Sequence, residues 1–204
     1  MSIIGAPIPI LSILIFLPLA GAILLLSIPR EYRRIHSRIA FIVSILTFLI
    51  AVSLLFLITD YKSFSVEEIF GWIPELGISY HLGVDGISII LVLLTAFLFP
   101  IVILYSTGSI SFREKDYYIL LLITETALLG TFLALDLILF FFFWEGVLIP
   151  MYLLIGIWGS RRRVYAAMKF VLFTVVGSLF MLLGMITLYA YSGSVGQATF
   201  DYIK

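Results

Sequence analysis

The chain has 204 residues, of which 63% are hydrophobic and only 12% are charged, and its mean hydropathy is +1.22. An average soluble protein is about half apolar and about a quarter charged, so a soluble core of this size could not bury so much apolar surface. The formal net charge is zero and cysteine is absent. This composition excludes nucleic-acid binding through a global positive field, disulfides, iron–sulfur ligation and cysteine catalysis, and it predicts a protein that works inside a lipid bilayer.

The apolar residues form stretches that are long enough to be transmembrane helices, since a helix needs about 20 apolar residues to cross the bilayer core. The expected spans are 8–28, 39–59, 84–105, 117–135, 137–157 and 164–189. They predict an all-α, polytopic membrane protein with about six transmembrane helices in a single membrane domain, 1–204. The first span has no basic region before it and is longer than the apolar core of a signal peptide, so we expect it to be retained.

The longest connection, 60–83, contains polar residues and glycine and proline breaks, which place it outside the bilayer. Within it the apolar residues Ile78, Tyr80 and Leu82 alternate with polar ones. Alternation of this kind predicts a short strand or a hairpin.

Basic residues are distributed unequally among the connections between spans. The connections after the second, fourth and sixth spans carry only Lys62 and Lys204. Those after the first, third and fifth spans carry nine: Arg30, Arg33, Arg34, Arg38, Arg113, Lys115, Arg161, Arg162 and Arg163. The positive-inside rule therefore predicts an integral membrane protein with both ends, and the 60–83 connection, outside the cytoplasm.

Three ionisable residues lie within the spans, where a charge is costly and marks either an ion pathway or a structural ion pair. Counting from Asp136 at ~1.5 Å per residue places Glu125 about 16 Å deep and Glu145 about 14 Å deep, so a tight antiparallel hairpin would bring both to a similar level. The same arithmetic places the backbone of Lys169 about 9 Å inside the cytoplasmic edge, where its long side chain could reach a carboxylate or return to the interface.

These residues suit proton transfer. Burial in low dielectric favours the protonated form of a carboxyl group, and a nearby cation favours the ionised form, so moving the cation switches the acid between holding and releasing a proton. Pro150, five residues after Glu145, removes a backbone donor and frees the carbonyl of Gly146 beside the acid. We predict that Glu145 is the strongest relay candidate, followed by Glu125 and Lys169.

Structural roles are the alternatives for the same residues. Glu145 could pair with another helix without conducting, and Glu125, flanked by two threonines, could be a hydrogen-bonding anchor between helices. Lys169 could be an interfacial residue whose ammonium reaches the membrane surface. Asp136 is expected to cap the fifth helix at the outer surface.

The remaining polar residues predict no further chemistry. His36 and His81 have no companion at metal-ligand spacing, so we expect two ordinary loop residues and no metal site. Gly177, Ser178 and Gly184 are typical of close packing between membrane helices. The sequence contains no nucleotide-binding motif and no catalytic triad, so we expect no bound cofactor and no redox chemistry in this chain.

Four motifs resemble a known family. They are YHLGVDGIS at 80–88, DLILFFFFWEGVLIPMYLLIGIWG at 136–159, AAMKF at 166–170 and TVVGS at 174–178. Together they resemble the antiporter-like membrane subunit of respiratory complex I, known as NADH:quinone oxidoreductase chain M in bacteria and subunit 4 in mitochondria. The likeness runs from about residue 8 to the end of the chain. The motifs around Trp158 and Lys169 favour the complex I branch over the related subunits of membrane-bound hydrogenases and sodium/proton antiporters.

The resemblance implies a proton-translocating subunit of an oxidoreductase that passes electrons from NADH, or a related donor, to quinone. In that family the glutamate that matches Glu145 is the central acid of the input half-channel and is paired with a lysine on the seventh helix. NADH, flavin, iron–sulfur clusters and quinone are expected in partner subunits and not in this chain. The implied location is the plasma membrane of a bacterium or archaeon, or an organellar inner membrane, in contact with lipid and not with nucleic acid.

The chain also departs from the family, because it stops at Lys204 whereas the family continues with further helices. Lys169 is therefore not the helix-seven lysine. We expect other membrane subunits and a separate or missing chain that supplies the helices from the seventh onward. Two functional alternatives stay open: a subunit of a multisubunit cation/proton antiporter or membrane-bound hydrogenase, and a membrane scaffold that does not conduct.

Overall fold

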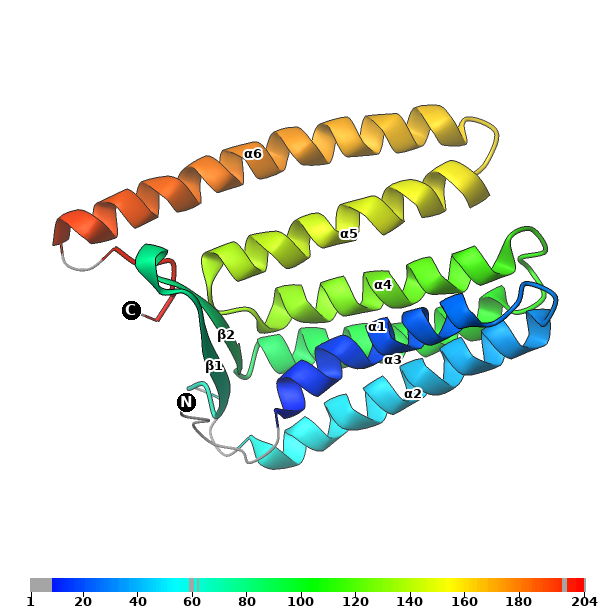
Figure 1. Ribbon diagram of the computed structural model, residues 1–204, viewed down its shortest axis with the longest axis horizontal. Helices are drawn as coiled ribbons and strands as arrows, with labels where there is room; N and C mark the ends of the chain where they lie inside the picture. The colour runs from blue at the N-terminus through cyan, green and yellow to red at the C-terminus, as the bar shows by residue number, and fades with distance from the viewer. Residues whose placement is uncertain (1–8, 59–60, 62, 196–197, 204) are drawn as a thin grey trace.

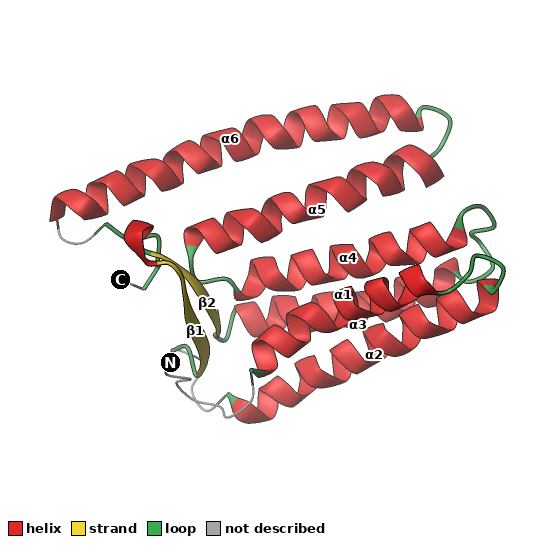
Figure 2. Cartoon of the chain, in the orientation of Figure 1, coloured by secondary structure: helices red, strands yellow, loops and turns green. Residues whose placement is uncertain are grey.

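The structure, a computed structural model, describes residues 9–58, 61, 63–195 and 198–203. Long helices lie side by side and alternate in direction, with a small hairpin at one end (Figures 1 and 2). The helices are α1 (Ile10–Ser27), α2 (Arg33–Leu57), α3 (Ser88–Ser106), α4 (Glu114–Leu133), α5 (Leu137–Trp158) and α6 (Arg163–Val195). All six are long and apolar enough to cross a membrane, so the predicted fold class is confirmed.

α2 and α6 extend furthest beyond the predicted spans. α2 begins at Arg33 and not at residue 39, and α6 continues to Val195 and not only to residue 189. Hydropathy identifies the part of a helix that lies in hydrocarbon, whereas backbone hydrogen bonding continues into the polar interface. Residues 8 and 59 of the predicted spans, and the two lysines Lys62 and Lys204, lie outside the described residues.

The two ends of the bundle differ in chemistry. The arginine-rich end consists of the connections α1–α2, α3–α4 and α5–α6. The hairpin end contains β1 (Val66–Ile73) and β2 (Ile78–Val84), which are antiparallel and joined by the short helix η1 (Pro74–Leu76). β2 contains the alternating residues 78–82, so the predicted strand is confirmed.

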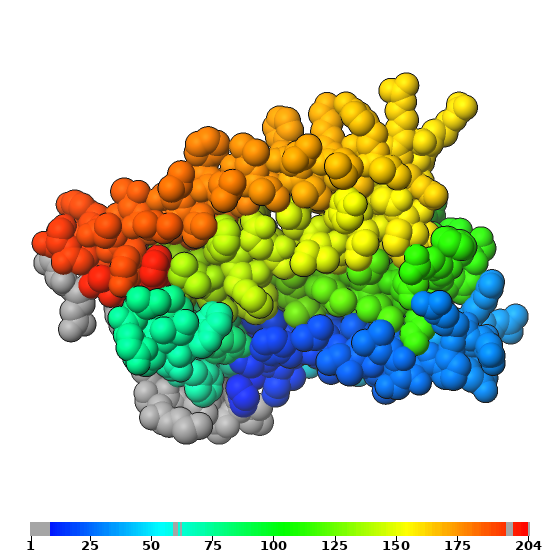
Figure 3. All heavy atoms as spheres, turned by 45° about the horizontal axis from the view of Figure 1, so that its top comes forward, coloured from blue at the N-terminus to red at the C-terminus, as the bar shows by residue number. Residues whose placement is uncertain are grey.

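α4 is the central helix. Its side chains Leu122, Leu129 and Leu133 are buried against α1, α2 and α3, and α5 packs on its other side. α5 approaches closely because α4 has Gly130 at the contact, where a Cβ would collide with the ring of Phe143. α6 packs mainly on α5 and forms a ridge along the surface (Figures 1 and 3).

Acidic residues hold the helix starts at the hairpin end. Glu68 of β1, only 2% exposed, accepts hydrogen bonds from the backbone N–H groups of Leu11 (2.7 Å) and Ser12 (3.1 Å) at the start of α1. A carboxylate in this position satisfies free helix donors and interacts favourably with the helix dipole. Glu68 therefore ties the hairpin to the first helix.

Asp85 caps α3 in a similar way. Its Oδ1 accepts from the backbone of Ile87 (3.2 Å) and Ser88 (2.7 Å), and the Ser88 hydroxyl accepts from the Asp85 N–H (2.9 Å). Burial alone would raise the pKa of Asp85, but the hydrogen bonds from Ser88 and Ile87 outweigh it and the pKa is lowered. This carboxylate is therefore ionised at neutral pH, as a helix cap requires.

Asp136 is the side-chain cap of α5, as predicted, and it lies at the hairpin end of the bundle, where it is fully buried. The sequence indicates a short connection between α4 and α5 but does not show that the hairpin covers it. The Asp136 carboxylate accepts from Ile138 N (2.9 Å) and Leu139 N (3.2 Å) in its own helix, and from Ser79 N (2.8 Å) in β2. One side chain thus caps a helix and holds a strand.

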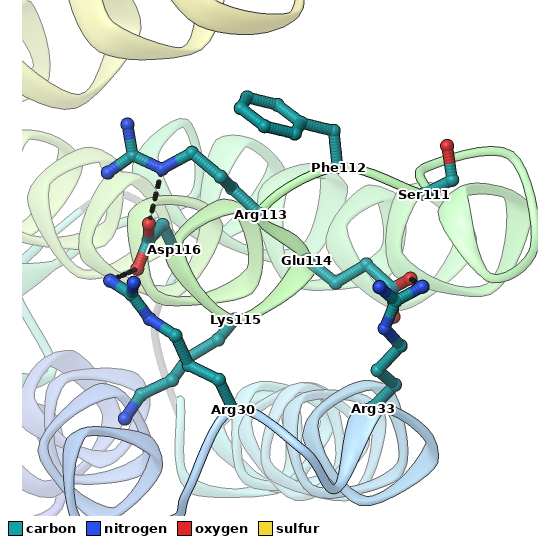
Figure 4. Close-up of a pocket in the computed structure, with 8 residues that line it drawn as sticks. All are labelled: Arg30, Arg33, Ser111, Phe112, Arg113, Glu114, Lys115 and Asp116. Atoms are coloured by element: carbon teal, nitrogen blue, oxygen red, sulfur yellow. Dashed lines mark hydrogen bonds and ion pairs between the residues drawn. The ribbon is translucent and has the colours of Figure 1, made fainter.

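Ion pairs cover the arginine-rich end, around a cavity of about 210 Å³ (Figure 4). They are Arg30–Asp116 (3.4 Å), Arg33–Glu114 (3.3 Å) and Arg113–Asp116 (2.7 Å). Lys115 donates to the carbonyls of Leu26 and Ile28, both at 2.8 Å, at the end of α1. The basic residues of the first and third connections therefore also join α1, α2 and α4.

Candidate functional site

The two acids within the spans lie at nearly the same level of the bundle. A Cβ built on Gly146 of α5 would lie 3.6 Å from the Cβ of Ala127 of α4. In this antiparallel register Glu145 is level with Leu128. Glu125 is three residues, or about 4.5 Å, closer to the arginine-rich end. The predicted similar depth therefore agrees with the packing to within about one helical turn.

The two acids nevertheless face opposite sides of α4. Successive residues of an α-helix are rotated by about 100°, so Glu125 is turned about 200° away from Ala127, which faces α5. Consistent with this, Glu125 Oε1 accepts a hydrogen bond from Ser44 Oγ of α2 at 3.0 Å. Among the described residues no hydrogen bond joins Glu125 to Glu145.

Glu125 is enclosed completely, with 0% exposure. Its second carboxyl oxygen, Oε2, is buried and has no hydrogen-bond partner among the described residues, and neither has the neighbouring Thr126 hydroxyl. No ion pair of the described part of the chain includes Glu125. An ionised carboxylate is costly in such surroundings, so this site favours a carboxyl group that holds its proton.

Glu145 lies between α5 and α6. It is half-buried, and its Oε1 is buried without a hydrogen-bond partner in the part of the chain that the structure describes. Gly156, eleven residues further along α5 and therefore on the same face, packs against α6, where its Cβ would lie 3.6 Å from that of Ala167. The same register places Ser178 of α6 level with Glu145.

The helix is irregular beside Glu145. Pro150 is buried inside α5 and has no backbone N–H, so the carbonyl of Gly146 loses its helical donor. A free carbonyl next to a half-buried carboxyl group provides two polar groups that water can bind. Irregular helix of this kind is tolerated at membrane depth where it is covered by protein or lines a hydrated cavity.

Lys169 is not brought to either acid. It is exposed, and its ammonium lies 6.0 Å from the centroid of the Tyr165 ring on the same helix, in cation–π geometry. The register of α5 and α6 places Lys169 level with Leu154, nine residues or about 13 Å from the level of Glu145. The ion pairs of the described chain do not include Lys169, and its relay role stays a prediction.

An apolar cavity of about 340 Å³ lies between α4, α5 and α6. It is lined by Thr124, Leu128, Trp144, Val147, Leu148, Met151, Phe170 and Thr174. A lining of this kind suits hydrocarbon side chains and not ordered water. This cavity therefore offers no polar path to Glu145.

The two histidines were expected in loops, and this expectation is wrong for both. His36 lies in the first turn of α2, fully buried, and both ring nitrogens lack a hydrogen-bond partner among the described residues. His81 is buried in β2, with its Nδ1 3.2 Å from Asp201 and its Nε2 3.2 Å from Glu67. Burial depends on tertiary packing, which the local sequence does not show. Among the described residues no group of three side chains could hold a metal ion.

Ser44 is a site residue that sequence reasoning missed. The signal for it is the spacing of small and polar residues within an apolar span, which places them on one face of α2: His36, Ser37, Ala40, Ser44, Thr47 and Ala51, all buried. By contrast, Gly177 and Gly184 of α6, expected at a close helix contact, have nothing within 4 Å of a built Cβ in the described structure.

Relatives of known sequence resemble most of the chain. A family described as "NADH:quinone oxidoreductase/Mrp antiporter, TM" matches residues 134–204. The chain is 43% identical over 188 residues to NADH-ubiquinone oxidoreductase chain 4 of Marchantia polymorpha, covering 90% of this chain and 38% of the relative. It is 41% identical over 201 residues to NADH-quinone oxidoreductase subunit M of Rhodobacter capsulatus, covering 95% and 39%. The chain thus spans less than half the length of these relatives.

Solved structures show the same arrangement of helices. A chain of respiratory complex I from Thermus thermophilus matches with a TM-score of 0.79 and 30% identity, over 94% of this chain and 38% of that one. A chain of the Mrp complex from Dietzia sp. DQ12-45-1b matches with a TM-score of 0.76 and 20% identity, over 90% of this chain and 20% of that one. The second likeness shows the fold alone.

Proposed function

We propose that this chain belongs to the family of antiporter-like membrane subunits that includes NADH-quinone oxidoreductase subunit M and NADH-ubiquinone oxidoreductase chain 4, which it resembles over 90–95% of its length. We propose further that it is part of the proton-translocating membrane arm of an oxidoreductase that transfers electrons from NADH, or a related donor, to quinone. Protons pass through buried carboxyl groups of this chain, while electrons pass through other subunits. NADH, flavin, iron–sulfur clusters and quinone belong to those subunits.

The observation that carries this proposal is the position of Glu145. It lies within the region that the family matches, near the middle of an apolar helix. One of its carboxyl oxygens is buried and has no hydrogen-bond partner among the residues of the described ranges. The described chain brings no cation to it. We therefore propose that Glu145 exchanges its proton with groups outside this segment.

The exposed faces of the helices indicate where partners of the chain bind. α6 is exposed along most of its length, and Glu145 faces it. We propose that other membrane subunits, and the further helices by which the relatives exceed this segment, cover this side, and that lipid covers the exposed faces of α2 and α3. The relatives and the complex I neighbour are subunits of multisubunit assemblies, which supports this arrangement.

We propose an orientation with the arginine-rich end in the cytoplasm and the hairpin end outside it, in accordance with the positive-inside rule. The 204 residues contain no cysteine, so a single introduced cysteine is the only one in this segment, and the same vesicles without it give the background labelling. In right-side-out vesicles a membrane-impermeant maleimide is expected to label Glu75→Cys in the exposed hairpin turn and not Ser111→Cys at the arginine-rich end. Labelling of Ser111→Cys alone would contradict the orientation.

The functional test uses the assembled complex with the full-length subunit in sealed vesicles. Proton movement is measured with a pH-sensitive dye after addition of NADH, and separately after an imposed sodium gradient. NADH-driven, quinone-dependent proton translocation is the expected result. Proton exchange that follows the sodium gradient and ignores NADH would favour the cation/proton antiporter, and vesicles that respond to neither would favour a scaffold.

A further inference from the structure

Glu125 is a buried acid that a path through Glu145 does not use. The two carboxyl groups are separated by the body of α4, since Glu125 contacts α2 and Glu145 faces α6. A proton on one therefore cannot pass to the other by a direct hydrogen bond. Glu125 needs its own explanation.

In the described part of the chain, no charged group on α1 to α4 is placed to balance an ionised Glu125. α1 contains no titratable residue, and α3 contains only Tyr105, at the arginine-rich end. The titratable residues of α2 are Arg33, Arg34, His36 and Arg38, all in its first two turns, and those of α4 besides Glu125 are Glu114, Lys115, Asp116, Tyr117 and Tyr118, near the same end. In the middle of the bundle Glu125 is the only described group on these four helices that can exchange a proton.

The hydrogen bond from Ser44 determines which oxygen of Glu125 carries the proton. Its hydroxyl donates to Glu125 Oε1, which makes Oε1 the carbonyl oxygen of the neutral acid and leaves the proton on Oε2. Oε2 is buried and has no partner among the described residues, so this O–H is free to donate to a water molecule. The pair is thus arranged as a carboxyl group with a fixed acceptor side and an available donor side.

We propose that Glu125, positioned by Ser44, is a second proton-binding site of this subunit, on the opposite side of α4 from Glu145. The inference rests on the proposed function, because the site takes part in the same proton transport.

Toward the arginine-rich end the nearest buried titratable side chain is Tyr118, on the same face of α4 and seven residues, about 10 Å, from Glu125. The next is His36 of α2, which is buried on the same side of that helix and lies eight residues, about 12 Å, from Ser44. Ala40, in an apolar cluster, lies between them, so protons that pass this way need water to enter that stretch.

The test uses the assembled complex with the full-length subunit and infrared difference spectroscopy between its oxidised and NADH-reduced states. A carbonyl band of a protonated carboxylic acid that disappears in Glu125→Gln is assigned to Glu125. In Ser44→Ala this band is expected to move to higher frequency, because the carbonyl loses its hydrogen bond, and Ser44→Thr is expected to restore it. Ser53→Ala is the matched control, since the Ser53 hydroxyl donates to Ile50 O of its own helix at 2.7 Å.

Proton pumping provides the second readout. Glu125→Gln, which is nearly isosteric, is expected to slow NADH-driven pumping by about tenfold or more, since positioned acids contribute about 10²–10⁴-fold to proton transfer. A Glu125→Gln complex that pumps normally, with no change in the carbonyl bands, would overturn the second site while leaving the function of Glu145 intact. Normal pumping by Glu145→Gln as well would instead contradict the proposed function. An unshifted band in Ser44→Ala would overturn the positioning role of the serine.

Discussion

Replacing Glu145 by glutamine is expected to reduce NADH-driven proton pumping by the assembled complex by at least about tenfold, within the 10²–10⁴-fold range of a positioned proton-transfer group. Glutamine has nearly the same shape and keeps the contacts of α5 with α6, but its amide cannot carry the proton. Glu145→Asp keeps a carboxyl group but has a side chain that is shorter by one methylene. The pumping rate of this variant is expected to lie between those of the Glu145→Gln complex and the native complex. Pumping is measured as acidification of sealed vesicles per NADH oxidised.

The control is Glu75→Gln, which removes an exposed carboxylate from the hairpin turn and is expected to leave pumping unchanged. Assembly of each variant is checked by the amount of complex in the membrane. A Glu145→Gln complex that assembles and pumps like the native one would assign Glu145 to a structural contact with a neighbouring helix. The proposed relay would then lose the residue that supports it best.

The sequence predicts the number and rough position of the helices because each must supply its own apolar length. Depth could be predicted for a similar reason: Asp136 marks the α4–α5 turn, and a fixed rise per residue converts sequence distance into depth. The rotation of each helix about its own axis could not be predicted from the sequence. Glu125 and Glu145 share a level, but only the contacts of Ala127 with Gly146 and of Ser44 with Glu125 show that they face different helices.

Lys169 is a second example of a position that the sequence predicts only in part. Its distance from the arginine-rich end follows from the sequence, but its distance from Glu145 depends on how α6 is placed along α5. The contact of Gly156 with Ala167 sets that register and leaves the lysine about 13 Å from the acid along the helix axes. Polar residues that lie near each other only after folding, such as His81 with Asp201, give no local signal at all.

Replacing Asp136 by alanine is expected to lower the free energy of unfolding by about 3 kcal/mol, which is the largest structural effect we predict. Loss of a side-chain helix cap costs about 1 kcal/mol, and leaving a covered backbone N–H without an acceptor costs about 1–3 kcal/mol more. Both losses occur at once, because the carboxylate serves the start of α5 and the N–H of Ser79 in β2. Thermal unfolding of the full-length protein in detergent measures the change.

Two further variants separate the contributions. Asp136→Asn keeps an oxygen for Ile138 N and Leu139 N but turns an amide toward Ser79 N. The helix cap is therefore retained and the contact with the strand is lost. The stability of this variant is expected to lie between that of Asp136→Ala and that of the native protein. Ser79→Ala removes only a hydroxyl contact at 3.4 Å and keeps the backbone N–H, so its effect is expected to be small. If Asp136→Ala were as stable as Ser79→Ala, the buried carboxylate would not be what joins the hairpin to α5. The level of Glu145, nine residues into that helix, would then be held by the contacts of α5 with α4 and α6 alone.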